Sequence, residues 1–502
     1  MLDASKVAIG SIHLTLQNVI TTLIGIVGIA FLARTITQEE MGILAAVTLI
    51  TSLIQLASDF GLSSSLLKYV SELKGKGQDY SAHFISALTF RTPVAFVLCL
   101  LFLFVSGSFL TAFFRTDPRL IPLIAIYSII YALEPPFHSL LLGLGQMKKV
   151  AICGITMTAA RWIVILALVN AGHGLYGAMI GYVTGELTLL LLFVASTAKL
   201  VTFQEGLLSK SAKLIPQLLK FSWPLFLSAI VSFLYAWYDR MLLLAFLPLA
   251  DVGVYDVSYK AFGVLAAMAA SLGSPLFPYY GMAYGRKDHK AINQAIKTAT
   301  RYTMLIVFPL TLGMLSTAKP IITLFAGDQY LQGWTILVIL SVFGLVLGVS
   351  PAFTGLLLIY EKTKTVLFLS FIPVISSLAL LPTLWVSGLN GLATIRGASM
   401  VFTFALSLYV LSKIVKVEID KQALVNSLAT STVMAAIVLA IQQLYYSKFL
   451  LPAYALIGAT IYFAGIRVLK TLNKADIELM RQIVGKKLAR HLARILGYSE
   501  TN

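Results

Sequence analysis

Apolar runs of about 20 residues recur along this 502-residue chain from one end to the other. A run of that length, folded as an α-helix, crosses about 30 Å of hydrocarbon, so the pattern favours a bundle of membrane-spanning helices. We predict about fourteen spans, at residues 10–34, 41–66, 84–106, 120–144, 150–170, 175–198, 221–248, 253–280, 301–318, 333–360, 365–387, 391–412, 423–443 and 451–469.

The composition supports a membrane protein and excludes a soluble one. Hydrophobic residues make up 58% of the chain and charged residues only 12%, about half the charged fraction of a soluble domain. A membrane-spanning β-barrel would show short alternating segments instead of long apolar runs. We therefore predict an all-α polytopic membrane protein. Cys99 and Cys153 both fall inside apolar spans without metal-ligand spacing, so we expect no disulfide framework, metal or cofactor.

The net charge of +17 is concentrated in every second loop. The loops after even-numbered spans carry Lys68, Lys74, Lys76, Lys148, Lys149, Lys199, Lys210, Lys213, Lys220, Arg286, Lys287, Lys290, Lys297, Arg301, Lys362, Lys364, Lys413, Lys416 and Lys421. The loops after odd-numbered spans are short and nearly neutral. Because Lys and Arg are retained on the cytoplasmic side during insertion, we predict that the basic loops and both termini are cytoplasmic. The positive charge therefore does not indicate a nucleic-acid partner.

The hairpin at residues 221–262 repeats the first hairpin of the chain. With an offset of 211 residues, Gly42 falls on Gly253 and Glu40 falls on Asp251. Six spans separate the copies, an even number, so both copies have the same orientation in the membrane. This predicts a parallel repeat whose pseudo-two-fold axis lies along the membrane normal, with two six-helix lobes around a central cavity.

We expect the chain to be divided accordingly. The predicted parts are an N-terminal six-helix lobe at 1–200, a cytoplasmic linker at 201–220, a C-terminal six-helix lobe at 221–415, appended helices 13 and 14 at 416–470, and a basic amphipathic tail at 471–502. The tail pattern suits a helix that lies on anionic lipids at the cytoplasmic face. The alternative is a tail that only increases solubility.

Ionisable side chains inside the predicted spans are the strongest pointers to function. Each costs at least about 2.5–3.5 kcal/mol near the bilayer centre, so such groups persist when they are paired or line water. They are Asp59, Arg91, Glu134, Arg161, Glu186, Asp239, Arg240, Asp256, Lys260 and Arg396. Either they are structural pairs within a lobe, or they line the cavity.

If these groups line the cavity, their chemistry assigns them different roles. The cations Arg91, Arg161, Lys260 and Arg396 are candidates to bind a phosphate or pyrophosphate. The acids Asp59, Glu134, Glu186, Asp239 and Asp256 are candidates for coupling or gating. No residue is a candidate for catalysis.

Local spacing adds three expectations about these charges. The depths of Asp59 and Arg91 match, which predicts a pair, and Asp256 precedes Lys260 by one helical turn. Asp239 and Arg240 are adjacent and cannot point the same way on a helix. We expect one of them to face the cavity and the other to face a neighbouring helix.

The sharpest local feature is Glu134-Pro135-Pro136. The two prolines leave backbone carbonyls without helical partners and kink the span. A carboxylate at a kink suits a gating or proton site. The alternative is a static kink in which Glu134 bonds to a neighbour.

Three stretches resemble the polysaccharide-transporter family, the Wzx-type lipid-linked oligosaccharide flippases of the MATE-like (MOP) exporter superfamily. They read YDRMLLLAFLPLADVGVYDVSYKAF, GIAFLARTITQEEMGILAAVTLITSLIQLASDFGLSSSLLKYVSE and LNKADIELMRQIVGKK. The resemblance extends over the whole chain and rests on positions of Gly and charge. It implies a cell-membrane transporter that flips a polyprenyl-(pyro)phosphate-linked oligosaccharide to the outer leaflet by alternating access. A proton or sodium ion would be the coupling ion.

Three other functions remain open. The first is a multidrug or metabolite antiporter of the same superfamily, which would prefer an anionic cavity. The second is a lipid II-type flippase, which is a closer relative of the polysaccharide branch than the antiporter is. A membrane glycosyltransferase or polymerase would need acid-base groups in a large outer loop. The largest predicted outer loops, about 107–119 and 319–333, do not concentrate such groups. We therefore predict a transporter and not an enzyme.

Overall fold

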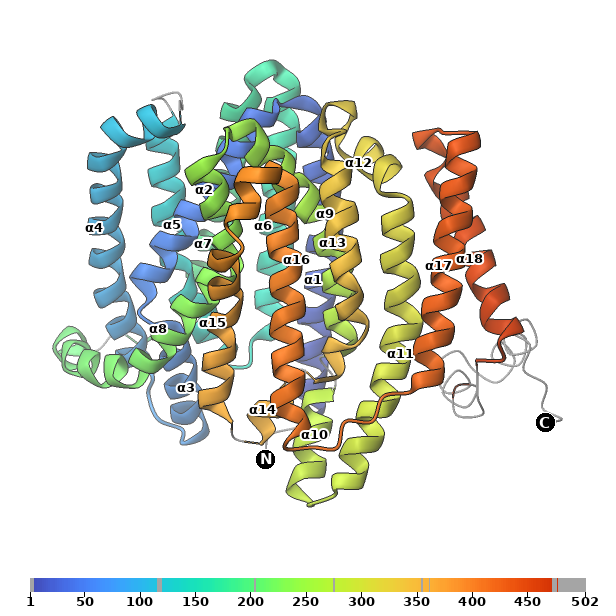
Figure 1. The fold of residues 1–502 in the computed structure, drawn as a ribbon. Helices are drawn as coiled ribbons and strands as arrows, with labels where there is room; N and C mark the ends of the chain where they lie inside the picture. The colour runs from blue at the N-terminus through green and yellow to red at the C-terminus, as the bar shows by residue number, and fades with distance from the viewer. Residues whose placement is uncertain are drawn as a thin grey trace. The chain divides into compact units, whose positions relative to one another are not determined.

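The computed structural model describes residues 4–114, 120–202, 205–273, 276–353, 355–360, 362–471 and 476. These residues form helices joined by short loops, and no strand occurs among them (Figure 1). Within this part of the chain, ten helical stretches are long and apolar enough to cross a membrane, or eleven if a bent pair at 333–359 counts as one span. The all-α polytopic fold is confirmed. The number of fourteen spans stays a prediction.

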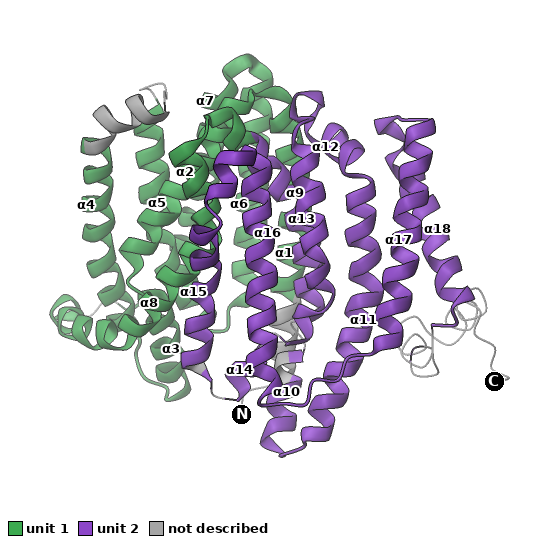
Figure 2. Ribbon diagram, viewed as in Figure 1, with its two compact units in different colours: residues 1–253 green, residues 254–502 purple. Residues whose placement is uncertain are grey.

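The chain forms two compact units, residues 1–253 and 254–502 (Figure 2). The boundary lies in the first turns of α9 (Leu249–Gly273). Helix α8 (Leu207–Phe246) spans the end of the predicted linker and the first predicted helix of the second lobe. It packs against α2, α3 and α4 of the first unit. The two units are defined by packing, whereas the predicted lobes are defined by the sequence repeat. The predicted lobes, linker and appended helices therefore remain predictions. The predicted tail lies outside the described residues except for Thr471 and Asp476.

The first unit is a helical bundle. Its other helices are α1 (Ala4–Thr35), α2 (Gln38–Asp59), α3 (Leu62–Gly75), α4 (Ser81–Phe114), α5 (Leu120–Gly143), α6 (Met147–Leu168) and α7 (Gly174–Thr197). Helix α2 begins with a capping box, since Thr37 Oγ1 accepts from Glu40 N at 3.2 Å and Thr37 N donates to Glu40 Oε2 at 2.8 Å. This cap fixes the start of the helix that carries Gln55 and Asp59.

Two glycines bring α2 and the first turn of α9 into direct backbone contact. A Cβ placed on Gly42 would lie 2.0 Å from Leu249 O, and one on Gly253 would lie 2.1 Å from Gln38 O. With the offset of 211, Gln38 corresponds to Leu249 as Gly42 does to Gly253, so the two contacts are reciprocal. A two-fold axis produces reciprocal contacts of this kind. The contacts are consistent with the predicted repeat, which stays a prediction.

The second unit is also helical. It contains most of α9, then α10 (Leu276–Gly285), α11 (His289–Ser316), α12 (Ala318–Ala326), α13 (Gly333–Gly344), α14 (Leu356–Ile359), α15 (Thr363–Ala379), α16 (Pro382–Ser412), α17 (Lys421–Leu444) and α18 (Leu451–Val468). Helix α17 packs against α11 and α18. The contact with α11 ties the last helical pair to the rest of this unit.

Arg301, which we grouped with the cations of a loop, is instead a buried residue of α11. Its guanidinium pairs with Asp420 Oδ2 at 2.7 Å, and with Asp476 Oδ1 at 3.1 Å and Oδ2 at 2.6 Å. Asp420 caps α17 by accepting from Ala423 N at 3.0 Å. Arg301 therefore joins α11, the start of α17 and the segment after α18 at one point.

We expect Arg301→Ala to lower the melting temperature of the purified protein by several degrees, because it leaves two carboxylates in a partly buried site without their cation. Burial raises the pKa of Asp420, but the hydrogen bonds from Ala423 and Arg301 and the charge of Arg301 outweigh it, so the pKa is lowered from 3.8. A lowered pKa stabilises the fold above the unfolded-state pKa, and this contribution is lost as the pH falls through the folded-state pKa.

The difference in melting temperature between wild type and Arg301→Ala should therefore stay constant from neutral pH down to about pH 5. Below about pH 4 this difference should shrink. Thermal unfolding across this pH range measures it. Lys290→Ala is the control, since Lys290 lies in the first turn of α11 and is exposed. Equal melting temperatures for the two variants would contradict the structural role of Arg301.

Candidate functional site

The prolines of α5 shape the first site. The helix continues through Pro135 and Pro136, but each proline lacks the N–H that would bond to the carbonyl four residues earlier. The two carbonyls concerned are those of Tyr131 and Ala132. Gln55 Nε2 donates to Tyr131 O at 3.3 Å, and Arg91 Nε donates to Ala132 O. Side chains from α2 and α4 thus bond to both carbonyls.

Arg91 is fully buried and uses its donors within the protein. Besides Ala132 O, it pairs with Asp59 Oδ1 and lies 3.4 Å from Ser63 Oγ and from Gln55 O. The predicted pairing of Asp59 with Arg91 is present. Since all three nitrogens of the guanidinium have protein partners, the geometry favours a role for Arg91 in positioning its neighbours.

A cavity of about 350 Å³ opens beside this pair. Its lining combines polar side chains of α2, α3 and α4 with Ala229, Phe233 and Trp237 of α8. The lining residues are Ser52, Gln55, Leu56, Asp59, Ser63, Arg91, Pro135, Ala229, Phe233 and Trp237. A lining with both hydrogen-bonding groups and aromatic side chains can hold a ligand that has both hydroxyls and an apolar face. We call this cavity the α2–α8 pocket.

A second buried cluster lies among α5, α6 and α7. Arg161 pairs with Glu186 Oε1, and its guanidinium carbon lies 4.9 Å from the centre of the Tyr182 ring. The Glu134 and Glu186 carboxyls interact electrostatically, and both side chains are buried. Among the described residues, Glu134 Oε1, Glu186 Oε2 and Arg161 Nε are buried and have no hydrogen-bond partner. Two adjacent carboxyl groups with free oxygens can share one proton.

The adjacent charges Asp239 and Arg240 in α8 contact each other, and the expectation that one of them faces the cavity remains a prediction. Arg240 Nη1 lies 3.3 Å from Asp239 Oδ1, which also accepts from Arg240 N at 2.9 Å. The long Arg240 side chain folds back onto the acid and lies over the Trp237 ring, 5.3 Å from its centre. The two side chains therefore do not diverge to opposite faces, because a flexible arginine can reverse the direction that its Cα imposes.

The remaining candidates lie in the second unit on α9 and α16. Lys260 Nζ pairs with Asp256 Oδ2 at 2.6 Å, as the spacing predicts. Arg396 Nη2 donates to the Tyr259 hydroxyl at 2.8 Å. The two pairs lie on α9 and α16, and their functional roles remain predictions.

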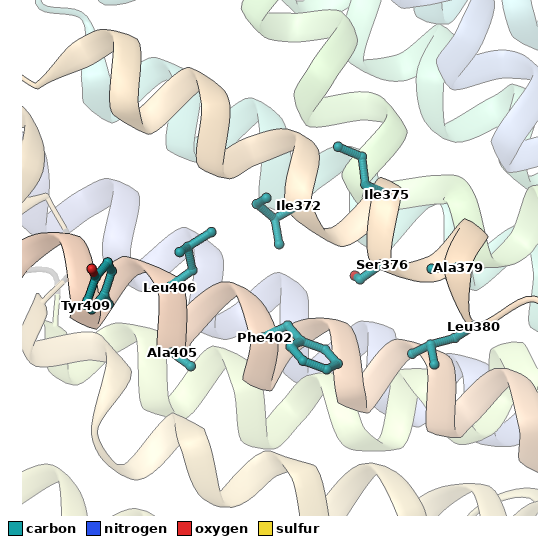
Figure 3. Close-up of a pocket in the computed structure, with 9 residues that line it drawn as sticks. All are labelled: Ile372, Ile375, Ser376, Ala379, Leu380, Phe402, Ala405, Leu406 and Tyr409. Carbon is teal, nitrogen blue, oxygen red and sulfur yellow. The ribbon is translucent and has the colours of Figure 1, made fainter.

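A groove in the second unit runs between α15 and α16 (Figure 3). Its volume is about 530 Å³. The lining residues are Ile372, Ile375, Ser376, Ala379, Leu380, Phe402, Ala405, Leu406 and Tyr409. We call it the α15–α16 groove. In contrast to the α2–α8 pocket, it is almost entirely apolar.

Sequence reasoning missed several residues of these sites. Gln55 comes from another helix, so no local spacing identifies it as the partner of a proline-freed carbonyl. Arg91 is a predicted site residue, but its bond to the second of these carbonyls could not be read from the sequence. Phe233 of α8 lies within an apolar run, and no charge or motif in the sequence marks it as part of a site. No group of three potential metal ligands occurs in the described part of the chain.

Comparison with known families identifies the chain. A family model described as polysaccharide biosynthesis protein matches residues 7–284, more than half of the sequence. The chain belongs to the polysaccharide biosynthesis protein family. A second model, MatE, matches residues 224–383. These two matches confirm the expected relationship of the chain to the polysaccharide branch of the MATE-like superfamily.

Three curated relatives are each 22% identical to the chain. The probable low-salt glycan biosynthesis flippase Agl15 of Haloferax volcanii aligns over 66% of this chain and 67% of its own. The succinoglycan biosynthesis transport protein ExoT of Rhizobium meliloti aligns over 63% and 61%. The lipopolysaccharide biosynthesis protein WzxC of Escherichia coli aligns over 68% of each. The family member thus spans about two thirds of these relatives.

Solved structures support the fold. The lipid II flippase MurJ in an inward closed conformation has a TM-score of 0.74 at 16% identity, covering 92% of this chain and 98% of MurJ. An inward-facing multidrug resistance MATE transporter has a TM-score of 0.55 at 13% identity, covering 81% and 98%. At these identities the likeness shows the fold of the family member and nothing about its substrate.

Proposed function

We propose that this protein is a transporter that flips a polyprenyl-(pyro)phosphate-linked oligosaccharide from the cytoplasmic to the outer leaflet by alternating access. The family and the three curated relatives support this function over that of an enzyme. The relatives are named as a probable glycan biosynthesis flippase, a succinoglycan biosynthesis transport protein and a lipopolysaccharide biosynthesis protein. We further propose that the protein resides in the cell membrane with both termini in the cytoplasm and its tail on anionic lipids.

The observation that carries this proposal is the α2–α8 pocket. Trp237 and Phe233 present aromatic surface, and Ser52, Gln55 and Asp59 present hydrogen-bonding groups across about 350 Å³. A sugar ring has an apolar face that stacks on aromatics and hydroxyls that bond to amides and carboxylates. The pocket therefore suits part of a glycan. Because Arg91 is saturated by protein partners, we propose that it holds Asp59 and Gln55 in place.

The Glu134–Glu186 pair supports coupling to protons. The groups that face it are Arg161, Arg91, Tyr127, Tyr131 and Tyr182. Arg161 neutralises one carboxylate and Arg91 is already paired with Asp59, so one negative charge of the pair remains for a proton to neutralise. We propose that this proton is bound and released as the protein changes conformation.

Glu134→Gln should abolish the effect of a pH gradient on transport, because an amide cannot release a proton. In proteoliposomes, wild-type transport should speed up several-fold when an inward-directed proton gradient is imposed, whereas the variant should be equally slow with and without it. Glu205→Gln is the control, since Glu205 is exposed between α7 and α8. An undiminished gradient effect in Glu134→Gln would exclude this carboxyl from coupling.

Reconstitution also separates the proposed function from that of an antiporter, which the MATE likeness keeps open. Purified protein in proteoliposomes should move a fluorescent polyprenyl-pyrophosphate oligosaccharide across the bilayer at a rate above that of protein-free vesicles. Expulsion of cationic dyes under an ion gradient, without movement of the lipid-linked sugar, would establish the antiporter instead.

A further inference from the structure

The α15–α16 groove is lined almost entirely by apolar side chains. Only two of the residues that line it, Ser376 and Tyr409, carry a polar side chain. The Ser376 hydroxyl bonds within the protein, to Pro373 O at 3.1 Å and to Ser399 Oγ at 3.0 Å. The rest of the surface is aliphatic or aromatic carbon. The groove therefore suits a hydrocarbon ligand.

Two lysines lie beyond the same end of this groove. On α16, Phe402, Leu406, Tyr409 and Lys413 follow at helical spacing on one face, and Lys413 Nζ lies 4.2 Å from the centre of the Tyr409 ring. Figure 3 places Ile372 of α15 opposite Leu406 of α16.

The helical rise of 1.5 Å per residue gives the distance of each lysine, along the helix axis, from the position of Ile372 and Leu406. Lys413 lies about 10 Å beyond Leu406, and Lys364 about 12 Å beyond Ile372. Both lysines are exposed. Since the two helices run in opposite directions, both displacements point to the same end of the groove.

We propose that the α15–α16 groove holds the isoprenoid chain of the lipid substrate, with its phosphate between Lys364 and Lys413. The inference rests on the proposed function, which supplies a lipid of this kind. Charge complementarity places an anionic head at the lysine end and an uncharged chain along the groove. One groove between two neighbouring helices accommodates one chain, which favours a single-chain polyprenyl phosphate over a two-chain phospholipid.

The position of the site predicts from which leaflet the lipid binds. According to the charge pattern of the loops, Lys364 and Lys413 belong to the cytoplasmic side. The chain would then lie in the bilayer with its phosphate at the cytoplasmic surface. A lipid bound here is one that has not yet been flipped.

Photolabelling of the full-length protein in nanodiscs tests this site. The probe is a polyprenyl phosphate with a diazirine in its chain, and labelled peptides are identified by mass spectrometry. We expect labels on α15 and α16, about tenfold less labelling in Ala405→Trp, which fills the groove, and a similar loss in Lys364→Ala/Lys413→Ala. Leu378→Trp, an exposed position of α15 outside the groove, and Lys421→Ala should label as wild type does.

Competition identifies the source of the chain. Excess unlabelled polyprenyl phosphate should displace the probe, and an equal amount of phosphatidylglycerol should not. Equal competition by phosphatidylglycerol would overturn the proposal in favour of a phospholipid site. Labels spread evenly over lipid-facing helices, or full labelling of Ala405→Trp, would also overturn it.

The translocation assay keeps this inference separate from the proposed function. Labelling confined to the groove in a protein that moves no lipid-linked sugar would support the site and contradict the flippase. Translocation with no labelling of α15 or α16 would support the flippase and contradict the site. Folding of every variant is checked by its elution profile and melting temperature.

Discussion

Asp59→Ala will destabilise the protein by about 3–5 kcal/mol, the usual result of leaving one partner of a buried ion pair without its counter-ion. Arg91 is fully buried, and its Nη1 pairs with Asp59 Oδ1. Membrane depth adds to the cost, since an unpaired guanidinium there has little access to water. The folded fraction that survives heating in detergent measures the effect.

The α5 prolines allow a sharper version of this test. Arg91→Leu removes the charge but also removes the donor to Ala132 O. Pro136 has no N–H, so it cannot donate to this carbonyl in its place. Pro136→Ala restores an N–H for that carbonyl. The triple variant Asp59→Leu/Arg91→Leu/Pro136→Ala should therefore be more stable than Asp59→Leu/Arg91→Leu by about 1–3 kcal/mol, the cost of an unsatisfied buried acceptor. Equal stability of the two would show that Arg91 does not serve this carbonyl.

Gly42→Ala and Gly253→Ala should each reduce the yield of folded protein several-fold. An added Cβ would lie 2.0 Å from Leu249 O in the first variant and 2.1 Å from Gln38 O in the second. Both obstacles are backbone atoms, which cannot rotate away as a side chain can, so the helices must separate. Overpacking of this kind costs about 1–3 kcal/mol or more.

Gly263→Ala is the control for both glycine variants. It lies on α9 like Gly253, and a Cβ there meets nothing within 4 Å. Because alanine favours helix over glycine by about 0.5–1 kcal/mol, this control should be neutral or slightly stabilising. Size-exclusion profiles of the expressed variants measure the outcome. A normal profile for Gly42→Ala would contradict the close backbone contact of α2 with α9.

Local patterns predicted the helices and their charges well. The apolar runs predicted long apolar helices, and the four-residue spacing predicted the pairing of Asp256 with Lys260. These features depend on periodicity and on the cost of charge in lipid, both of which can be read along the chain.

Long-range partners could not be predicted in this way. The prolines of α5 indicated free carbonyls, but only the folded bundle brings Gln55 and Arg91 to them. Arg301 looked like a loop cation because its partners, Asp420 and Asp476, lie more than a hundred residues further along the chain. The direction of the Arg240 side chain depends on rotamers that the sequence does not specify.

The most direct test of the central claim is the rate at which a fluorescent polyprenyl-pyrophosphate oligosaccharide crosses proteoliposomes that contain Ala229→Trp. Ala229 lines the α2–α8 pocket, so the indole should fill it. Ser228→Trp is the matched control, because Ser228 is the preceding residue, is exposed and lies outside the pocket. We predict that Ala229→Trp stops translocation while Ser228→Trp keeps the wild-type rate. Wild-type translocation by folded Ala229→Trp would contradict a glycan site in this pocket.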